Sequence, residues 1–208
     1  MLKIFGRNNS INVQKVMWAI GELGLPHERI DVGGAFGRNK EPDYLAMNPN
    51  GLVPTLQEDD GFILWESNTI VRYLAAKHGA GTLEPKNLQE QALASQWMDW
   101  QYTVAAPAIF DLFWGLVRTP PEQRNAQAIE TAKRKTIDAM YILNKQLGKT
   151  AFMAGDNFSM GDIPVGLFAY RYRKLVPDGP SLSHAARWAA AIEGRPAFQQ
   201  HVSSVPLT

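Results

Sequence analysis

The N-terminal part of the chain alternates between the apolar patterns of strands and those of helices. A short apolar run at 2–5 predicts a strand. Apolar residues recur at helical spacing from Val13 to Leu23 and stop before Gly24, which predicts a helix. Residues 27–32 alternate again. The helix is therefore expected to return the chain to a second strand in the same sheet, as a βαβ unit.

A polar, glycine-rich passage separates this unit from the next apolar segments. A short helix is expected at 43–47, and residues 48–51, Asn-Pro-Asn-Gly, predict a turn. Two apolar runs follow at 53–57 and 62–65, and the Asp60-Gly61 pair between them is a strong hairpin signal. The sheet is therefore expected to gain an antiparallel pair.

A third helix closes this first domain. Ser67 is suited to cap the helix N-terminus, and Gly79 follows its expected end. The elements then come in the order βαβαββα. Residues 80–87, which include Gly81 and Pro85, predict a linker.

From residue 88 onward the strand signals stop, and the chain is expected to be wholly helical. Two apolar stripes predict core positions, Trp97 and Trp100 among them: Leu93, Trp97, Trp100 and Val104, and then Ile137, Met140, Leu143 and Leu147. Pro107 is expected to kink or end the first long helix, and Pro120-Pro121 to separate it from the next. Residues 159–162, Ser-Met-Gly-Asp, resemble a capping box with Asp in place of Glu or Gln, and predict a helix over 163–170.

Composition sets aside several classes of function. The 21 Lys and Arg residues against 20 Asp and Glu give a formal charge of +1, without the basic excess that nucleic-acid binding requires. No apolar run approaches the roughly 20 residues that span a bilayer. The N-terminus lacks the apolar segment and cleavage site of a signal peptide. We therefore expect a cytoplasmic protein with no nucleic-acid or membrane partner.

The absence of cysteine limits the chemistry further. It excludes disulfides, zinc-thiolate sites and a protein thiol nucleophile, so that thiol chemistry would need a thiol from a ligand. The histidines are too scattered to suggest a ligand pair, and no metal is expected: His27, His78, His184 and His201. The sequence contains no GxSxG motif, and the glycines near residue 33 lack the Gly-Lys-Ser/Thr of a phosphate-binding loop.

Three motifs in this order resemble those of the cytosolic glutathione transferase superfamily over essentially the whole chain. Residues 48–56 resemble its turn and strand with a cis-proline, residues 64–70 its Glu-Ser-x-x-Ile box, and residues 159–162 the start of its C-terminal core helix. The resemblance implies an α/β thioredoxin-like domain at 1–79, followed by an all-α glutathione transferase C-terminal domain at 88–208.

The resemblance also implies function. Glutathione would be held mainly by the first domain, and a small hydrophobic electrophile or a disulfide by a cleft against the helical one, in a homodimer with a role in detoxification. Residues 9–13 look most like theta and nu-type patterns, in which a hydroxyl residue follows the first strand and, in nu-type proteins, an asparagine lies two positions later. No Tyr or Cys lies near this loop, which sets aside the tyrosine and cysteine types. The nu-type likeness adds glutathione-dependent disulfide reduction as an activity.

The chemical requirement is an ionised glutathione thiol, because a free thiol with a pKa of about 8.5 is mostly protonated near pH 7. Ser10 and Asn12 lie between the first strand and the first helix. There a hydrogen bond and the helix dipole would both stabilise a thiolate. Both residue types are also preferred N-caps, which is the alternative interpretation. With the resemblance, Ser10 is the expected donor, and Asn12 is a rival or second donor.

The rest of the glutathione site is expected near the cis-proline motif. A cis bond before Pro54 would let Val53 present its N–H and C=O to an extended peptide; the alternative is an ordinary proline at a strand start. Leu52 stands where many relatives have a lysine. Lys40 or Arg38 is therefore the candidate contact for the glycyl carboxylate.

The γ-glutamyl group is expected at the start of the third helix. There the Ser67 hydroxyl, backbone N–H groups and the helix dipole would hold its carboxylate, while Glu66 pairs with its ammonium. Capping alone would explain Ser67 but not Glu66. Asp162, by contrast, is expected with Ser159 to fix the core helix rather than to take part in chemistry.

The second-substrate site has the weakest sequence signal. The candidates are Phe110, Trp114, Arg118 and Tyr170. At helical spacing such aromatic residues more often belong to a core. A rival function from another class is a non-catalytic binding or regulatory protein with the same fold.

Overall fold

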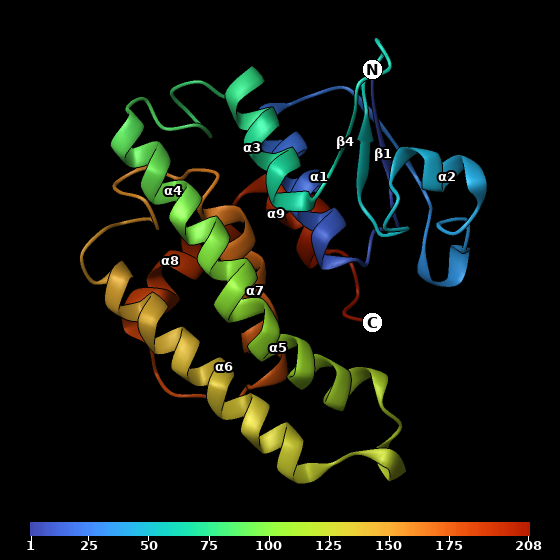
Figure 1. Cartoon of the computed structure of the whole chain (residues 1–208). Coiled ribbons are helices and arrows are strands. Elements are labelled where there is room, and N and C mark those ends of the chain that lie inside the picture. Colours follow the sequence, from blue (N-terminus) through green and yellow to red (C-terminus); the bar gives the residue numbers. More distant parts are fainter. The chain divides into compact units, whose positions relative to one another are not determined.

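The computed structural model describes residues 1–208 and contains two compact units (Figure 1). The first unit consists of Met1–Glu84 and Pro196–Pro206, and the second of Pro85–Arg195 and Leu207–Thr208. The segment Pro196–Pro206 therefore belongs to the N-terminal unit. The sequence pattern predicts it as part of the helical domain, because it is helical and follows other helices.

The N-terminal unit is built on a four-stranded sheet in the order β2-β1-β3-β4. β1 (Leu2–Phe5) pairs in parallel with β2 (His27–Ile30) and antiparallel with β3 (Thr55–Gln57), which pairs antiparallel with β4 (Ile63–Trp65). In this register Ile4 lies opposite Leu56, and both side chains are fully buried. The predicted βαβαββα order is confirmed, and it is the thioredoxin-like arrangement.

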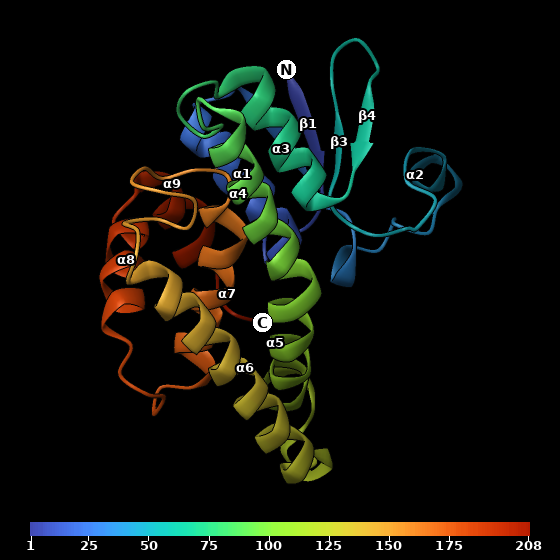
Figure 2. The same cartoon turned by 60° about the vertical axis from the view of Figure 1, so that its left-hand side comes forward.

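Two helices cover one face of this sheet, and a short helix lies on the other side (Figures 1 and 2). α1 (Ile11–Leu23) and α3 (Ser67–His78) pack against each other on the covered face, and α2 (Pro42–Met47) is the short helix. Every residue from Val13 to Ile20 in α1 is buried. The helix ends where Gly24 takes a left-handed conformation with φ of 62°, which glycine adopts without steric cost.

Aromatic packing explains why the C-terminal segment belongs to this unit. α9 (Pro196–Phe198) and the π-helical turn η5 (Gln199–Ser203) contact α1. The fully buried rings of Phe198 and Trp18 meet edge to face at 4.9 Å. A Cβ on Gly21 would lie 2.8 Å from that of Ala197, so the close approach requires glycine. Residues that far apart in sequence leave no local periodic signal of this contact.

The second unit is all helical, as predicted. α6 runs beside α5, and α7 packs against α4, α5 and α8. Its helices are α4 (Leu88–Trp100), the π turn η2 (Gln101–Ala105), α5 (Ala106–Phe113), the π turn η3 (Trp114–Arg118), α6 (Ala126–Leu147), α7 (Asp162–Leu175) and α8 (Ser183–Glu193). Short 3₁₀ turns lie at Gly34–Phe36 in the first unit and at Pro121–Gln123 in the second. The predicted interruption between two helices at Pro120-Pro121 is therefore observed.

Pro107 changes the first long helix without ending it. The π turn at Gln101–Ala105 comes immediately before α5, which places Pro107 in the first turn of α5. There its missing N–H is tolerated, and the wider turn relieves the clash of its ring with the preceding carbonyl. The helical path therefore continues to Arg118.

The first apolar stripe is partly confirmed: Trp97 is buried as predicted, and Trp100 is partly buried. Leu93 and Val104 are 43% and 44% exposed. The other buried positions of this segment are Ala94, Met98 and Gln101. The π turn shifts the phase at Val104, because it adds a residue to one turn of the helix. In the second stripe Met140, Leu143 and Leu147 are buried as expected, and Ile137 is partly buried.

Asp162 organises the start of α7. One of its oxygens accepts hydrogen bonds from the Met153 N–H at 2.9 Å and the Trp188 indole N–H at 2.8 Å. The other oxygen accepts from the Ser159 N–H at 2.9 Å and the Ser159 hydroxyl at 3.2 Å. Complete burial raises the pKa of Asp162 to about 6, although these hydrogen bonds act to lower it. This geometry supports the predicted structural role, and α7 runs on to Leu175, beyond the predicted end.

Asp162→Ala should destabilise the protein by about 3–5 kcal/mol, because four donors lose their acceptor in a buried site. Urea unfolding measures this loss. The free energy of unfolding of Asp162→Asn should lie between those of the wild type and the alanine variant, since the NH₂ group of the asparagine would face a Ser159 donor. Asp156→Ala is the matched control, because Asp156 is an exposed carboxylate in the same loop, and it should change stability by less than about 0.5 kcal/mol. Equal effects of the two alanine variants would contradict the network's role.

Docking of the C-terminal segment should weaken in acid. The rings of His201 and His27 lie 6.1 Å apart. Burial of the half-buried His201, and then its proximity to His27, lower the pKa of His201 from its ordinary 6.5. The folded unit thus favours neutral His201. The stability that neutral His201 gives to the folded unit is complete above its ordinary pKa and is lost as the pH falls below that value.

Hydrogen exchange of the amides in residues 198–203 measures this effect between about pH 7.5 and pH 5.5, on either side of the ordinary histidine pKa. After correction for intrinsic exchange, protection should fall with pH in the wild type. His201→Gln should flatten that dependence. The same pH profile in both proteins would show that His201 does not cause it.

Candidate functional site

Three segments meet at the carboxyl end of β1. The chain leaves β1 at Gly6 and enters α1 at Ile11, while Val53 approaches from the turn before β3. A Cβ on Gly6 would lie 2.5 Å from Cγ2 of Val13 and 3.2 Å from Cβ of Val53. The missing side chain at Gly6 therefore allows the loop, the helix and the turn to come together.

Ser10 occupies the N-cap position of α1 without acting as a side-chain cap. Its backbone has the extended conformation of an N-cap, with φ of −79° and ψ of 125°, and its carbonyl accepts the Gln14 N–H at 2.9 Å. Its side chain makes no capping hydrogen bond, and the residue is 8% exposed. The capping alternative is therefore not observed, and the hydroxyl remains available as a donor beside the helix N-terminus.

Asn12, the second residue of α1, is exposed and contacts the other helix of this face. Its Oδ1 accepts a hydrogen bond from the Ser67 hydroxyl at 3.3 Å. Its Nδ2 donates no hydrogen bond within the protein. The structure thus brings together two of the predicted site residues that lie 55 positions apart in sequence.

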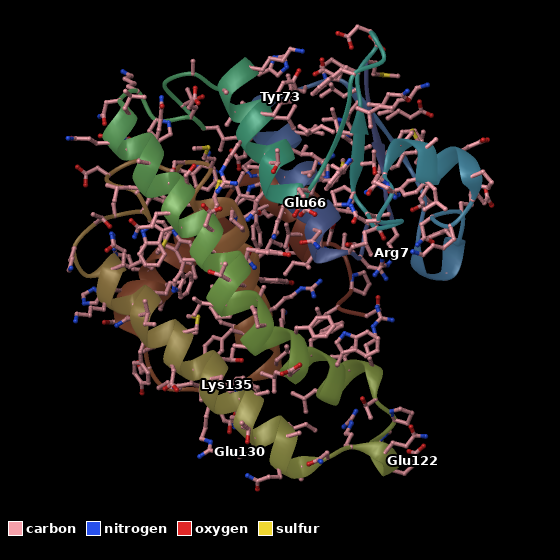
Figure 3. The ribbon with its side chains drawn as sticks, in the orientation of Figure 1. Arg7, Glu66, Tyr73, Glu122, Glu130 and Lys135 are labelled. Carbon is pink, nitrogen blue, oxygen red and sulfur yellow. The ribbon has the colours of Figure 1, made fainter.

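The start of α3 differs from the prediction by one residue. Ser67 is the first residue of the helix, and Glu66 is the N-cap, with φ of 72°, ψ of 110° and no side-chain capping bond. The positive φ arises where the chain turns from β4 into α3, and for a residue other than glycine it costs on the order of 1–3 kcal/mol. Glu66 is exposed at this helix N-terminus (Figure 3). The first N–H groups of α3 therefore follow a carboxylate residue whose side chain does not cap them.

The peptide bond between Val53 and Pro54 is cis, as the motif predicts. β3 begins only at Thr55, so that Val53 lies outside the sheet ladder. Neither its N–H nor its C=O makes a hydrogen bond within the protein. Both groups are available to pair with an extended peptide.

Sequence reasoning missed the buried polar residues that hold this turn. The Leu52 carbonyl accepts hydrogen bonds from the Tyr44 hydroxyl at 2.6 Å and from Asn48 Nδ2 at 3.0 Å. The Tyr44 hydroxyl also lies 2.9 Å from Thr55 Oγ1. Burial raises the pKa of Tyr44, which keeps it a neutral donor. The Asn-Pro-Asn-Gly signal marked the turn, but nothing in it indicated that α2 supplies the tyrosine.

Of the two candidate cations, Lys40 lies at the turn. Its Nζ donates to the Asn50 carbonyl at 3.2 Å, and a Cβ on Gly51 would lie 2.6 Å from that Nζ. Arg38 instead has its Nε 3.9 Å from the Glu41 carboxylate. Leu52 is 63% exposed.

A further cation near the site carried no sequence signal. A Cβ on Gly34 would lie 2.8 Å from Cδ of Arg7, and one on Gly33 would lie 3.3 Å from Cγ1 of Val53. The Gly33-Gly34 pair thus brings the Arg7 side chain close to Val53. Figure 3 shows Arg7 and Glu66 toward the same end of the sheet. Arg7 follows β1 in a loop without a recognisable motif, which is why the sequence did not indicate it.

The structure only partly brings together the candidates for the second substrate. Phe110 and Trp114 are 58% and 49% exposed, and their rings lie 5.7 Å apart. Trp114 also lines a cavity of about 590 Å³. Arg118 instead stacks over Phe113 at 5.6 Å and donates to the Thr208 carbonyl at 2.6 Å. Tyr170 lies on α7, with the Lys174 ammonium 5.4 Å from its ring.

Two further observations concern metal ions and membrane-spanning helices. No group of three or more His, Asp or Glu side chains is placed to hold a metal ion. None of the helices combines the length and apolar character needed to cross a membrane.

The fold and this site define a thioredoxin-like domain joined to a helical domain, and comparisons with known proteins identify the family. The glutathione S-transferase N-terminal domain matches residues 9–77, and the glutathione S-transferase C-terminal domain matches residues 105–196. The chain belongs to the glutathione S-transferase family. The resemblance inferred from its motifs is therefore confirmed.

Individual relatives match over the full length of the chain. Glutathione S-transferase GstB of Escherichia coli K12 is 43% identical over 210 residues, which cover 100% of both proteins. Glutathione S-transferase 3 of Zea mays is 30% identical over 99% of this chain and 95% of its own. The crystal structure of the theta class glutathione S-transferase from Xanthomonas axonopodis pv. citri with glutathione bound has a TM-score of 0.94 at 42% identity, covering 100% of this chain and 99% of that one.

Proposed function

We propose that this protein binds glutathione and activates its thiol for attack on an electrophilic small molecule. The observation that carries the proposal is the Ser10 hydroxyl, which lies beside the N-terminus of α1 and makes no capping hydrogen bond. The chain has no cysteine of its own, so that the thiol comes from the ligand. Relatives named as glutathione S-transferases over the whole length support transfer as the reaction.

The site supplies enough stabilisation for the thiolate. Lowering a thiol pKa from about 8.5 by about two units requires roughly 2.7 kcal/mol. A hydrogen bond to a charged acceptor contributes about 1.5–3 kcal/mol. A helix N-terminus adds roughly 0.3–1 kcal/mol. One hydroxyl at one helix end is therefore sufficient.

Glutathione would bind as an extended peptide. Its cysteinyl backbone pairs with the N–H and C=O of Val53, and its γ-glutamyl carboxylate lies at the N-terminus of α3 beside Ser67. Glu66 pairs with the γ-glutamyl ammonium. At the other end, Lys40 contacts the glycyl carboxylate, and Leu52 and Pro54 form the apolar part of the site.

The exposed pair Phe110 and Trp114 is our candidate for binding a small hydrophobic second substrate, with Arg118 and Tyr170 as lesser candidates. With an electrophile, the thiolate forms a carbon–sulfur bond and the leaving group departs with its electron pair. With a disulfide, the thiolate attacks one sulfur and releases the other as a thiolate. A homodimeric, cytoplasmic enzyme of detoxification is part of this proposal.

Binding to immobilised glutathione, followed by assays with 1-chloro-2,4-dinitrobenzene and hydroxyethyl disulfide, tests the proposal. Turnover of the first substrate supports the transferase, and turnover of the second supports disulfide reduction. Glutathione binding without turnover of either would favour a non-catalytic binding protein. Failure to bind glutathione would contradict the proposal as a whole.

Ser10→Ala should raise the pKa of the bound glutathione thiol by about one to two units, because it removes one charge-assisted hydrogen bond. Ultraviolet thiolate absorbance against pH measures this pKa, and circular dichroism checks that the fold is intact. Ser10→Thr retains the hydroxyl and should stay near the wild type. An unchanged pKa in the alanine variant would transfer the donor role to Asn12.

Glu66→Gln should weaken glutathione binding about tenfold, the equivalent of one charge-assisted contact. The pKa of the bound thiol should change much less, since Glu66 contacts the other end of the ligand. Comparison with Glu66→Gly separates the effect of the charge from that of the backbone conformation, because glycine removes the carboxylate and also relieves the positive φ. Calorimetric titration measures both affinities, and wild-type affinity in the glutamine variant would remove Glu66 from the site.

A further inference from the structure

One hydrogen bond joins the two helix N-termini of the proposed glutathione site. The Ser67 hydroxyl, in a residue only 6% exposed, donates to Asn12 Oδ1 at 3.3 Å. Asn12 lies in the first turn of α1 and Ser67 in the first turn of α3. The amide hydrogens on Asn12 Nδ2 have no acceptor within the protein. The Ser67 hydroxyl thus fixes the amide by its oxygen, and no acceptor within the protein holds its Nδ2 group.

A serine hydroxyl has a single hydrogen to donate. In the proposed complex the γ-glutamyl carboxylate lies at the N-terminus of α3, where it competes with Asn12 Oδ1 for that hydrogen. A hydrogen bond to a charged group is roughly twice as strong as one between neutral groups. The carboxylate therefore takes the hydrogen of Ser67, and the bond that holds Asn12 is lost.

We infer that this exchange couples recognition of the γ-glutamyl carboxylate to ionisation of the thiol, with Asn12 held by Ser67 in the empty site and released to donate from Nδ2 to sulfur when glutathione binds. Ser67 acts here as a positioning residue, and Asn12 as the group that contacts sulfur together with Ser10. The inference rests on the proposed function. Its consequence is specificity, because a thiol that lacks the γ-glutamyl carboxylate is bound but ionised less.

Simple electrostatics predicts the opposite result. A carboxylate near the thiol adds negative charge, which disfavours a thiolate and raises the thiol pKa. Release of Asn12 lowers the same pKa, because the thiolate gains a donor. The sign of the difference between two ligands, with and without the carboxylate, therefore separates the two effects.

The experiment compares glutathione with γ-aminobutyryl-cysteinylglycine, the same peptide without the α-carboxylate. The pKa of each bound thiol is measured from ultraviolet absorbance at saturating ligand. In the wild type the pKa should be lower for glutathione by on the order of one unit, about the worth of one hydrogen bond. Asn12→Ala should abolish or reverse that difference. Asn12→Asp, which keeps the shape and the acceptor but cannot donate when ionised, should do the same if the alanine variant folds poorly.

Substitutions of Ser67 test the positioning role. Ser67→Ala should bring the two pKa values together, because Asn12 is then released whichever ligand is bound. Ser67→Thr keeps the hydroxyl and should restore the wild-type difference. Thr69→Ala, an exposed residue one position beyond Asn68 in the same turn of α3, is the control for disturbance of the helix and should leave the difference unchanged.

Two results would overturn the coupling: a wild-type pKa that is equal or higher with glutathione, or a wild-type difference that persists in Asn12→Ala and Asn12→Asp. Each can arise while glutathione still binds with a lowered thiol pKa, so that neither is confused with failure of the proposed function. Failure of the proposed function would instead appear as a wild-type protein that binds neither ligand.

Discussion

Two helix N-termini on the same face of the sheet, neither of them capped by its own side chains, are the feature on which the proposed chemistry of this protein depends. α1 begins at Ser10 and α3 at Glu66, and neither N-cap residue makes a side-chain hydrogen bond to its helix. A missing cap costs about 0.5–2 kcal/mol at each end. Since Ser and Asn are among the best caps, stability alone would favour their use in that role. An anionic ligand instead requires uncapped N–H groups at the positive end of a helix dipole.

The surrounding structure keeps this strained region in place. Gly6 allows the chain after β1 to contact Val13 and Val53 closely. Tyr44 and Asn48 fix the Leu52 carbonyl, and the N–H and C=O of the next residue, Val53, make no hydrogen bond within the protein. The positive φ of Glu66 is another local cost that the fold tolerates where a ligand group is expected. The locally unfavourable features, two uncapped helix N-termini and a positive φ at Glu66, thus lie at the site, and the structure around it is locally favourable.

Local patterns were sufficient for most of the fold. β1, α1, the β3–β4 hairpin and α3 are each defined by apolar periodicity within a dozen or so residues and by strong terminal signals such as Gly24 and Asp60-Gly61. The motifs around Pro54, Glu66 and Asp162 are contiguous, so that the resemblance to the family can be recognised from the sequence alone. The prediction failed at Val104, which lies in the π turn at Gln101–Ala105: this turn adds a residue to one helical turn, and that phase shift has no sequence signature of its own.

The sequence by itself determined which residue types are present at the site and which thiol is absent: Ser10, Asn12, Val53, Glu66 and Ser67, in a chain without cysteine. Only the tertiary structure decided what those residues are free to do. It showed that Ser10 does not cap α1, that Ser67 donates to Asn12 across 55 positions, and that Phe198 returns the chain end to Trp18. The physical reason is that capping signals and periodicity report on neighbours along the chain. A hydroxyl's single hydrogen is assigned by whichever acceptor lies nearest in space.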